Sequence, residues 1–457
     1  MVLAFDENNG RGRAAISRMP SMIALRVGSA FKTVVAATLL GCASGSALLA
    51  QEISVYPGGK NGVYDVGATA TWSIETKGDS AVVTDLKYEL KTGGLTVSRS
   101  GLLTLSEGKT SFTASFDHPG WLLLEVTGKN AAGLEIKAAG GALFSPRKIE
   151  PAIPPPADFD AFWKAKLEEL AAVPMNPVLI EEKSGRDGVE SWLVQLDNIR
   201  GSRIHGVLAR PVKGGRLPAL LIVQWAGVYT LEKDWALNRA AQGWLTLNIQ
   251  AHDLPAIGPK SFYDDQFSGP LKNYWAIGNE DKETSYFLRM YLSCFRAADY
   301  LAIRPDWDGR VLVVTGGSQG GLQAILTAAL HPKITGAVAV VPAGCDQSGP
   351  EVGRDPGWPK WYNEIAGKDP ERVKTACRYY DIVNFASRVH CPVFVGVGLI
   401  DITCPAPGVF AGANRLAGPT EIMVMPLGDH QRQHQDCDAR AEAWLTALQA
   451  GRHPEAK

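Results

Sequence analysis

The sequence predicts an α/β fold, a mostly parallel sheet with helices on both faces, preceded by a small all-β sandwich. In the C-terminal two-thirds, apolar segments alternate with helical stretches, which is typical of parallel sheets. The expected strands are 219–223, 245–249, 311–314, 337–341, 393–397 and 422–425. In the N-terminal third, short alternating runs are separated by turn residues at intervals of about ten, as in an immunoglobulin-like sandwich.

The length of 457 residues exceeds one ordinary domain. A proline-rich stretch, PAIPPP at 151–156, is typical of a stiff linker. We therefore expect four parts, which are a signal peptide at 1–50, a β-sandwich accessory domain at 51–145, a linker at 146–157 and a catalytic α/β domain at 158–457.

The first fifty residues have the pattern of an export signal. Arg26 and Lys32 precede the apolar run 34–40, and small residues follow as far as Ala50. We expect an exported protein, periplasmic or extracellular. A lipoprotein anchored through Cys42 is the alternative interpretation.

Composition argues against several classes of protein. The formal net charge is −1, from 46 basic and 47 acidic residues, and no basic stripe indicates a nucleic-acid partner. Beyond residue 50 no segment is long and apolar enough to span a membrane. No cluster of His, Cys and carboxylate residues has metal-ligand spacing, so neither a metal nor another cofactor is expected. The spacing of the cysteines does not assign disulfide pairs.

The most informative motif is the hexapeptide GGSQGG at 316–321, which follows the apolar segment 311–314 and precedes a helical stretch. A serine at a sharp strand-to-helix turn within G-x-S-x-G is the nucleophile elbow of α/β-hydrolases. Gly316 and Gly320 leave room where side chains would collide. The motif therefore predicts Ser318 as a nucleophile, and the alternative is an ordinary glycine-rich βα turn.

A serine nucleophile needs a base, and the base needs an acid that orients it. In this fold both follow the serine, on loops after later strands, in the order acid and then histidine. Asp401 and His430 occupy such positions. His434 is the alternative base, and Asp346 is the alternative acid.

Two backbone N–H groups would complete the site by binding the oxyanion, those of Gln319 and Val228. His252 and Asp253 follow an expected strand and are candidates for the pocket rim, or else a surface pair. Trp358 and Trp361 lie in an aromatic loop that could stack a sugar ring or pack on a neighbouring subunit.

These motifs resemble the acetyl xylan esterase and cephalosporin-C deacetylase family over residues of about 150–447. The matching segments are PADFDAFW at 156–163, RPDW at 304–307 with the elbow at 316–321, PAGCD at 342–346 and GLIDITCP at 398–405. The resemblance implies a secreted serine carboxylesterase that removes acetyl groups from carbohydrate or another small acyl ester. It also implies a ring-shaped homo-oligomer, outside which an added N-terminal domain would have to lie.

Three positions depart from the family pattern. The family's Arg-Gly-Gln is Ala-His-Asp at 251–253, its His-Glu pair is His430–Gln431, and Val228 stands where it has a tyrosine. The triad is retained, while the polarity of the pocket differs. Because all candidate residues lie beyond the linker, we expect the sandwich to be an accessory to a catalytic part that begins near residue 151.

Two other functions remain open. A serine peptidase of the prolyl-oligopeptidase type has a similar elbow, but the roughly 90 residues before the linker are too few for its β-propeller. A catalytically dead protein that binds glycan through its sandwich is the second alternative.

Overall fold

The computed structural model describes residues 53–76 and 83–452. The expected export signal and Cys42 lie outside the described residues. The segment Ala50–Lys457 forms one compact unit, so the all-β part and the α/β part belong to the same body.

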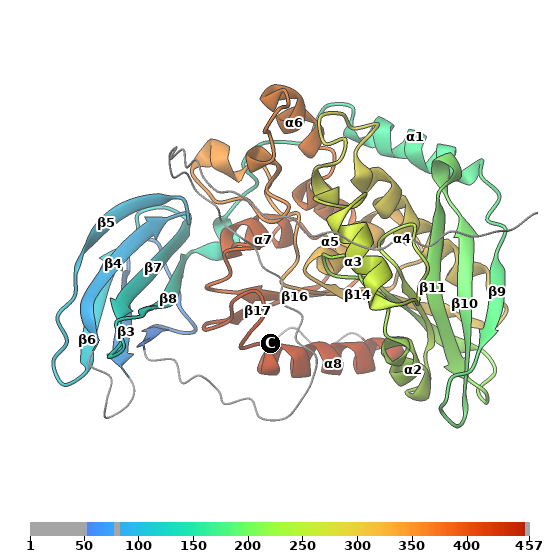
Figure 1. Cartoon of the computed structure of the whole chain (residues 1–457), viewed down its shortest axis with the longest axis horizontal. Coiled ribbons are helices and arrows are strands. Elements are labelled where there is room, and N and C mark those ends of the chain that lie inside the picture. Colours follow the sequence, from blue (N-terminus) through green and yellow to red (C-terminus); the bar gives the residue numbers. More distant parts are fainter. Residues whose placement is uncertain (1–52, 77–82, 453–457) are drawn as a thin grey trace, which may run out of the picture. The chain divides into compact units, whose positions relative to one another are not determined.

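The all-β part consists of two facing sheets (Figure 1). One is antiparallel, in the order β1 (Ile53–Pro57), β3 (Thr69–Thr76), β6 (Lys109–Ser115). The other has the order β2 (Val63–Tyr64), β8 (Glu135–Phe144), β7 (Gly120–Lys129), β4 (Thr84–Thr92), β5 (Thr96–Leu102). Trp72 and Ile74 of one sheet share a buried core with Leu124 and Val126 of the other. This arrangement confirms the predicted sandwich.

The α/β part is built on one nine-stranded sheet. Its strands, in spatial order, are β17 (Thr420–Met425), β16 (Val393–Gly398), β15 (Gly336–Val340), β14 (Trp307–Gly317), β12 (Leu217–Ile222), β13 (Leu245–Ile249), β11 (Arg203–Pro211), β10 (Val189–Asp197) and β9 (Val178–Glu182). Pairing is parallel from β17 to β13 and antiparallel beyond it. The predicted mostly parallel sheet is therefore confirmed.

Helices cover both faces of this sheet. Successive residues of β14 point to opposite sides, so Leu312 and Val314 join one core while Val311 and Val313 join another with Trp444. The second face carries α2 (Lys233–Ala241) and α8 (Gln435–Gln449), which lie together in Figure 1. The remaining helices are α1 (Phe159–Ala171), α3 (Lys260–Ser268), α4 (Tyr286–Ile303), α5 (Gln319–Leu330), α6 (Pro370–Cys377) and α7 (Ala406–Ala413). Short 3-10 turns lie at Pro146–Lys148, Ile199–Gly201, Tyr274–Ala276, Gly349–Val352, Trp361–Asn363, Ile382–Asn384 and Ala386–Arg388.

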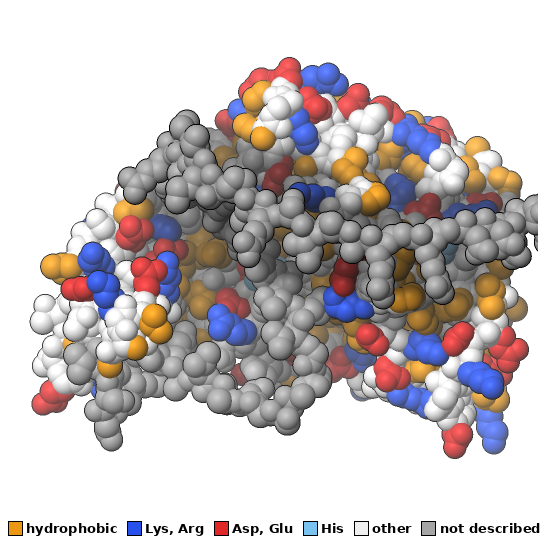
Figure 2. Space-filling model, in the orientation of Figure 1, with side chains coloured by type: hydrophobic (Ala, Val, Ile, Leu, Met, Phe, Trp, Pro, Cys, Tyr) orange, Lys and Arg blue, Asp and Glu red, His pale blue; other side chains and the backbone are white. Residues whose placement is uncertain are grey.

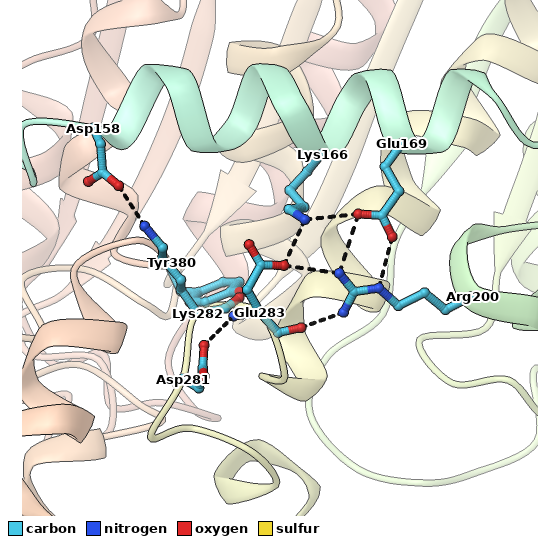
Figure 3. Close-up of polar contacts among 8 residues, drawn as sticks. All are labelled: Asp158, Lys166, Glu169, Arg200, Asp281, Lys282, Glu283 and Tyr380. Carbon is cyan, nitrogen blue, oxygen red and sulfur yellow. Dashed lines mark hydrogen bonds and ion pairs between the residues drawn. The ribbon is translucent and has the colours of Figure 1, made fainter.

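Charged contacts hold the first helix, α1, onto the α/β part (Figure 3). Lys166 Nζ lies 2.9 Å from a Glu169 oxygen and 2.7 Å from a Glu283 oxygen. The Arg200 guanidinium contacts the same two carboxylates. Because the two carboxylates and the two cations neutralise one another, the nearly buried Lys166 is tolerated between α1 and the neighbouring loops.

The described surface carries both signs of charge. Figure 2 shows Lys and Arg side chains interspersed with Asp and Glu over the face in view. Within residues 53–76 and 83–452, no helix has the length and apolar character needed to cross a bilayer.

Candidate active site

Ser318 occupies the turn between β14 and α5. Its backbone has φ 56° and ψ −122°, a strained conformation for a residue with a side chain. The turn is held by its own backbone, since the Ser318 N–H donates to Val340 O (2.9 Å) and the Ser318 carbonyl accepts from Leu322 and Ala343. The serine is thus fixed at the carboxyl end of β14, an interior strand of the sheet.

The flanking glycines are required by close backbone contacts. A Cβ on Gly316 would lie 2.6 Å from the Gly320 carbonyl carbon, and a Cβ on Gly320 would lie 2.5 Å from Val223 O. Backbone atoms cannot move aside as a flexible side chain can. Both positions therefore exclude any side chain, as the elbow motif predicts.

Three side chains from separate loops meet at the carboxyl ends of the parallel strands. Ser318 Oγ lies 2.9 Å from His430 Nε2, and His430 Nδ1 lies 2.8 Å from Asp401 Oδ2. The fully buried Asp401 also accepts the N–H groups of Thr403 and Cys404, each at 2.8 Å, through Oδ1. The carboxylate can only accept, so Nδ1 carries the proton and Nε2 is left to accept from the serine hydroxyl.

The alternative base and acid have other partners. His434 Nε2 lies 2.7 Å from Asp429 O and therefore donates to its own loop. Asp346 accepts from the Ala152 N–H at 2.8 Å and pairs with Arg354 at 2.7 Å. Neither is brought to Ser318, whereas the serine, the histidine and the acid predicted from the sequence do come together. Their catalytic roles stay predictions.

The N–H of Gln319 opens α5 beside Ser318, where the positive end of the helix favours a developing anion. A second donor would come from the turn after β12. The N–H of Gly227 donates to Tyr274 Oη at 3.2 Å. Because Gly227 is thus bonded to the interior, the N–H groups of Ala226 and Val228 are the candidates, and the role of Val228 stays a prediction.

The sequence left His252 either on the pocket rim or in a surface pair, and the structure places it in the interior instead. Its side chain is fully buried, and burial lowers its pKa to about 3. The neutral ring lies with Nε2 2.8 Å from Gly227 O and Nδ1 2.7 Å from Tyr286 Oη. Nε2 donates to the carbonyl, and Nδ1 accepts from the tyrosine hydroxyl. His252 thus supports the turn after β12 from beneath.

Asp253, the other candidate for the pocket rim or a surface pair, is exposed. Its carboxylate accepts from the Arg203 N–H at 3.0 Å and lies 3.0 Å from His205 Nε2, so it is bonded to β11. Two tyrosines that the sequence did not single out complete this network. Tyr274 Oη accepts from the Gly227 N–H of the turn, and Tyr286 Oη contacts the His252 ring beside it. Nothing in their local sequence distinguishes them from ordinary core tyrosines.

The aromatic loop is packed inward rather than presented to solvent. The sequence left Trp361 either to stack a sugar or to pack on a neighbouring subunit. Its ring is buried and its Nε1 donates to Trp275 O at 2.6 Å, so the ring is free for neither contact. Trp358 is half-buried between Trp275 and Phe287. Its ring therefore also packs on the protein.

A different tryptophan is exposed beside the serine turn. Trp225 follows β12 and its residue is 46% exposed. Its ring lies 5.2 Å from that of Tyr229, nearly parallel, and 4.9 Å from that of Trp235, edge-on. The preceding residue, Gln224, has its carbonyl carbon 3.2 Å from the position of a Cβ on Gly320. The backbone that leads into this exposed aromatic residue therefore adjoins the nucleophile elbow.

In residues 53–76 and 83–452, one group of potential metal ligands has its donor atoms within 4.8 Å of one another, Asp401, Cys404 and His430. Burial raises the pKa of the Cys404 thiol well above its usual range. A protonated thiol is a poor ligand, and the carboxylate oxygens already accept hydrogen bonds. The group therefore fits a proton relay better than an ion. The described cysteines are free thiols.

Comparison with known proteins places this site in a family. A profile described as acetyl xylan esterase (AXE1) matches residues 147–448. Acetyl esterase Axe7A of Xylanibacter ruminicola is 32% identical over 354 residues, covering 76% of this chain and 79% of that protein. The residues that the profile matches include the elbow, the acid loop and the histidine loop.

Solved structures have the same fold. An acetyl xylan esterase from Paenibacillus sp. R4 is 26% identical with a TM-score of 0.55, over 65% of this chain and 98% of that one. Acetyl xylan esterase 1 from Thermoanaerobacterium sp. JW/SL YS485 is 23% identical with a TM-score of 0.55, over 66% and 97%. From the profile and the identity to Axe7A, the chain belongs to the acetyl xylan esterase family.

Proposed function

We propose that this chain is an exported serine carboxylesterase that removes acetyl groups from carbohydrate through an acyl-enzyme on Ser318. The observation that carries the proposal is the continuous relay from Ser318 Oγ to His430 Nε2 (2.9 Å) and from His430 Nδ1 to Asp401 (2.8 Å). Membership of the acetyl xylan esterase family supports the class of ester.

The first half-reaction acylates the serine. Ser318 Oγ attacks the acetyl carbonyl carbon while His430 Nε2 accepts the hydroxyl proton, and Asp401 stabilises the resulting imidazolium. The carbonyl oxygen becomes an oxyanion, which the Gln319 N–H and one N–H of the turn after β12 bind. The ester C–O bond then breaks, and the imidazolium proton passes to the leaving sugar oxygen.

The second half-reaction releases acetate. Water attacks the acetyl carbonyl carbon of the acyl-enzyme while His430 accepts one of its protons. Collapse of this second tetrahedral intermediate breaks the bond to Ser318 Oγ, which takes the proton back from His430. The relay is thus restored for the next ester.

Trp225 supports a sugar as the leaving group. The apolar C–H face of a pyranose packs on an aromatic ring, and this indole is both exposed and braced by Tyr229 and Trp235. The relatives are described as acting on acetyl esters and acetyl xylan. Acetylated xylo-oligosaccharides are therefore the substrates to test first.

The test measures hydrolysis of three substrates by the full chain, namely an acetylated xylo-oligosaccharide, an octanoyl aryl ester and an aminoacyl-proline anilide. We expect acetate release from the first, far slower turnover of the second and none of the third. The matched control is Ser318→Ala, which should lower every rate together. Preferential cleavage of the anilide would indicate a peptidase, and glycan binding without hydrolysis would indicate a dead binding protein.

Export is tested separately. The positively charged start, the apolar run and the small residues up to Ala50 support cleavage of a signal before residue 51. Determining the N-terminus of the protein purified from a bacterial periplasm should give a residue near 51. An intact N-terminus in the cytoplasmic fraction would contradict export, and a lipid-modified Cys42 would indicate a lipoprotein.

A further inference from the structure

The loop that carries the acid Asp401 is bonded to the sandwich. Leu399 directly follows β16, and its N–H donates to Met425 O on β17 at 3.0 Å. Its carbonyl oxygen accepts from Trp121 Nε1 of β7 at 3.1 Å. Both residues are buried. Strand β17 of the α/β part therefore holds the N–H of Leu399, and a side chain of the sandwich holds its carbonyl oxygen.

A glycine makes this contact sterically feasible. A Cβ on Gly141 of β8 would lie 2.2 Å from Leu399 O and 2.9 Å from Trp121 Nε1. Gly62 similarly leaves room for the Leu399 side chain, since its Cβ would lie 2.4 Å from Cδ2. The acid loop thus lies in a recess of the sandwich that these glycines create.

A second chain of hydrogen bonds links the sandwich to Asp401 through the residues that follow it. The β4–β5 turn pairs with the loop after β15, where the Asp355 N–H donates to Gly93 O at 2.8 Å. From that loop the Trp358 N–H donates to Thr403 O at 2.7 Å, and the Thr403 N–H donates to Asp401 Oδ1 at 2.8 Å. The Gly93 N–H in turn donates to Trp121 O at 2.9 Å. The sandwich therefore contacts the acid loop directly before Asp401, at Leu399, and reaches it after Asp401 only through the loop that follows β15.

We propose that Trp121 and Gly141 are positioning residues that hold Asp401 in line with His430, so that the sandwich is part of the catalytic machinery. The inference rests on the proposed function, in which Asp401 is the catalytic acid. Displacing a catalytic group by about 1 Å can cost on the order of a hundredfold in rate. This proposal replaces the expectation, made from the sequence, that the sandwich is only an accessory domain.

The first test is Trp121→Phe, which keeps an aromatic ring and removes the N–H. We expect kcat for a small aryl acetate to fall about tenfold with KM nearly unchanged, because the bond acts on the reacting geometry rather than on substrate binding. The matched control is Trp72→Phe. Trp72 is buried in the same sandwich and its Nε1 has no hydrogen-bond partner, so this variant should lower the melting temperature and leave kcat intact.

A second pair of variants, Gly141→Ala and Gly140→Ala, tests the proposal in case Trp121→Phe does not fold. Gly141→Ala places a methyl group against Leu399 O, whereas Gly140→Ala places one against Trp72 and Val55 inside the sandwich, at 2.6 Å from each. We expect both to lower stability and only Gly141→Ala to lower kcat. Equal kcat values for the two variants would contradict the proposal.

A double-mutant cycle tests whether the effect passes through the acid. In an Asp401→Asn background, Trp121→Phe should cost nothing further, since there is no charge left to position. Additive losses would overturn the proposal, as would an unchanged kcat in Trp121→Phe while Asp401→Asn is inactive. If Ser318→Ala or Asp401→Asn retained full activity, the proposed function itself would fail.

Discussion

His252 Nε2 lies 2.8 Å from the carbonyl oxygen of Gly227. The carbonyl and the N–H of one trans peptide point in opposite directions. This bond therefore directs the N–H of Val228 away from the buried ring. A buried histidine thus sets the orientation of the peptide between Gly227 and Val228.

We expect His252→Phe to lower kcat about tenfold through a less well-aligned oxyanion site, a smaller loss than deletion of a donor would cause. The measurement is kcat on a small aryl acetate. The matched control is His331→Phe, because His331 is also buried and pairs with Asp299 through Nε2 at 3.2 Å. Equal kcat values for the two variants would exclude a role of His252 in the site.

The same residue makes stability depend on pH. Burial lowers the pKa of His252 from 6.5 to about 3, so between these values the unfolded chain binds a proton that the folded chain does not. The free energy of unfolding therefore falls as pH falls, by up to about 1.4 kcal/mol per pH unit from this group. Urea unfolding between pH 7 and pH 5 should give a shallower dependence for His252→Phe than for the native chain. Parallel curves would contradict the depressed pKa.

Lys166 and Lys164 lie on the same helix in different surroundings. Lys166 lies between Glu169 and Glu283 (Figure 3). Its side chain is 11% exposed, whereas that of Lys164 is 79% exposed. Removing one partner of a buried pair leaves charge uncompensated, so Lys166→Ala should lower the free energy of unfolding by about 2 kcal/mol. Lys164→Ala should change it little. Similar melting temperatures for the two variants would show that the network of α1 adds no stability.

Trp225 gives a prediction for substrate choice. Trp225→Ala should raise KM for an acetylated xylo-oligosaccharide about tenfold, through the loss of one stacking contact. Its kcat/KM for a small aryl acetate should stay close to the native value. The control is Trp192→Ala, a tryptophan on β10 that packs under Arg210. A loss of equal size on both substrates would mean that Trp225 shapes the site rather than the sugar contact.

Local sequence predicted the elements that short-range rules control. The glycines around Ser318 indicated the turn, and the strands before Asp401 and His430 indicated the edge at which they meet. Burial of loop side chains was not predictable in this way, which is why Trp361 was misplaced. Its exposure depends on packing between loops distant in sequence.

The contact between Trp121 and Leu399 joins residues 278 positions apart. No periodicity or turn signal in either segment indicates the other, because the pairing arises only when a sandwich and a parallel sheet fold against each other. His252 is a similar case, since a polar residue after a strand is as compatible with a rim as with a buried network. The sequence thus predicted the groups of the relay but not what supports them.

In the proposed mechanism Ser318, activated by His430 and Asp401, forms the acyl-enzyme. The most direct measurement is labelling by a fluorophosphonate, with the modified peptide identified by mass, in the native chain and in Ser318→Ala, His430→Ala, His434→Ala and Asp401→Asn. We expect one label on the peptide containing Ser318, none in Ser318→Ala, and labelling slowed about 10³-fold or more in His430→Ala and strongly in Asp401→Asn. His434→Ala should react at the native rate. Labelling that survives in Ser318→Ala, or that depends on His434 instead of His430, would contradict the account.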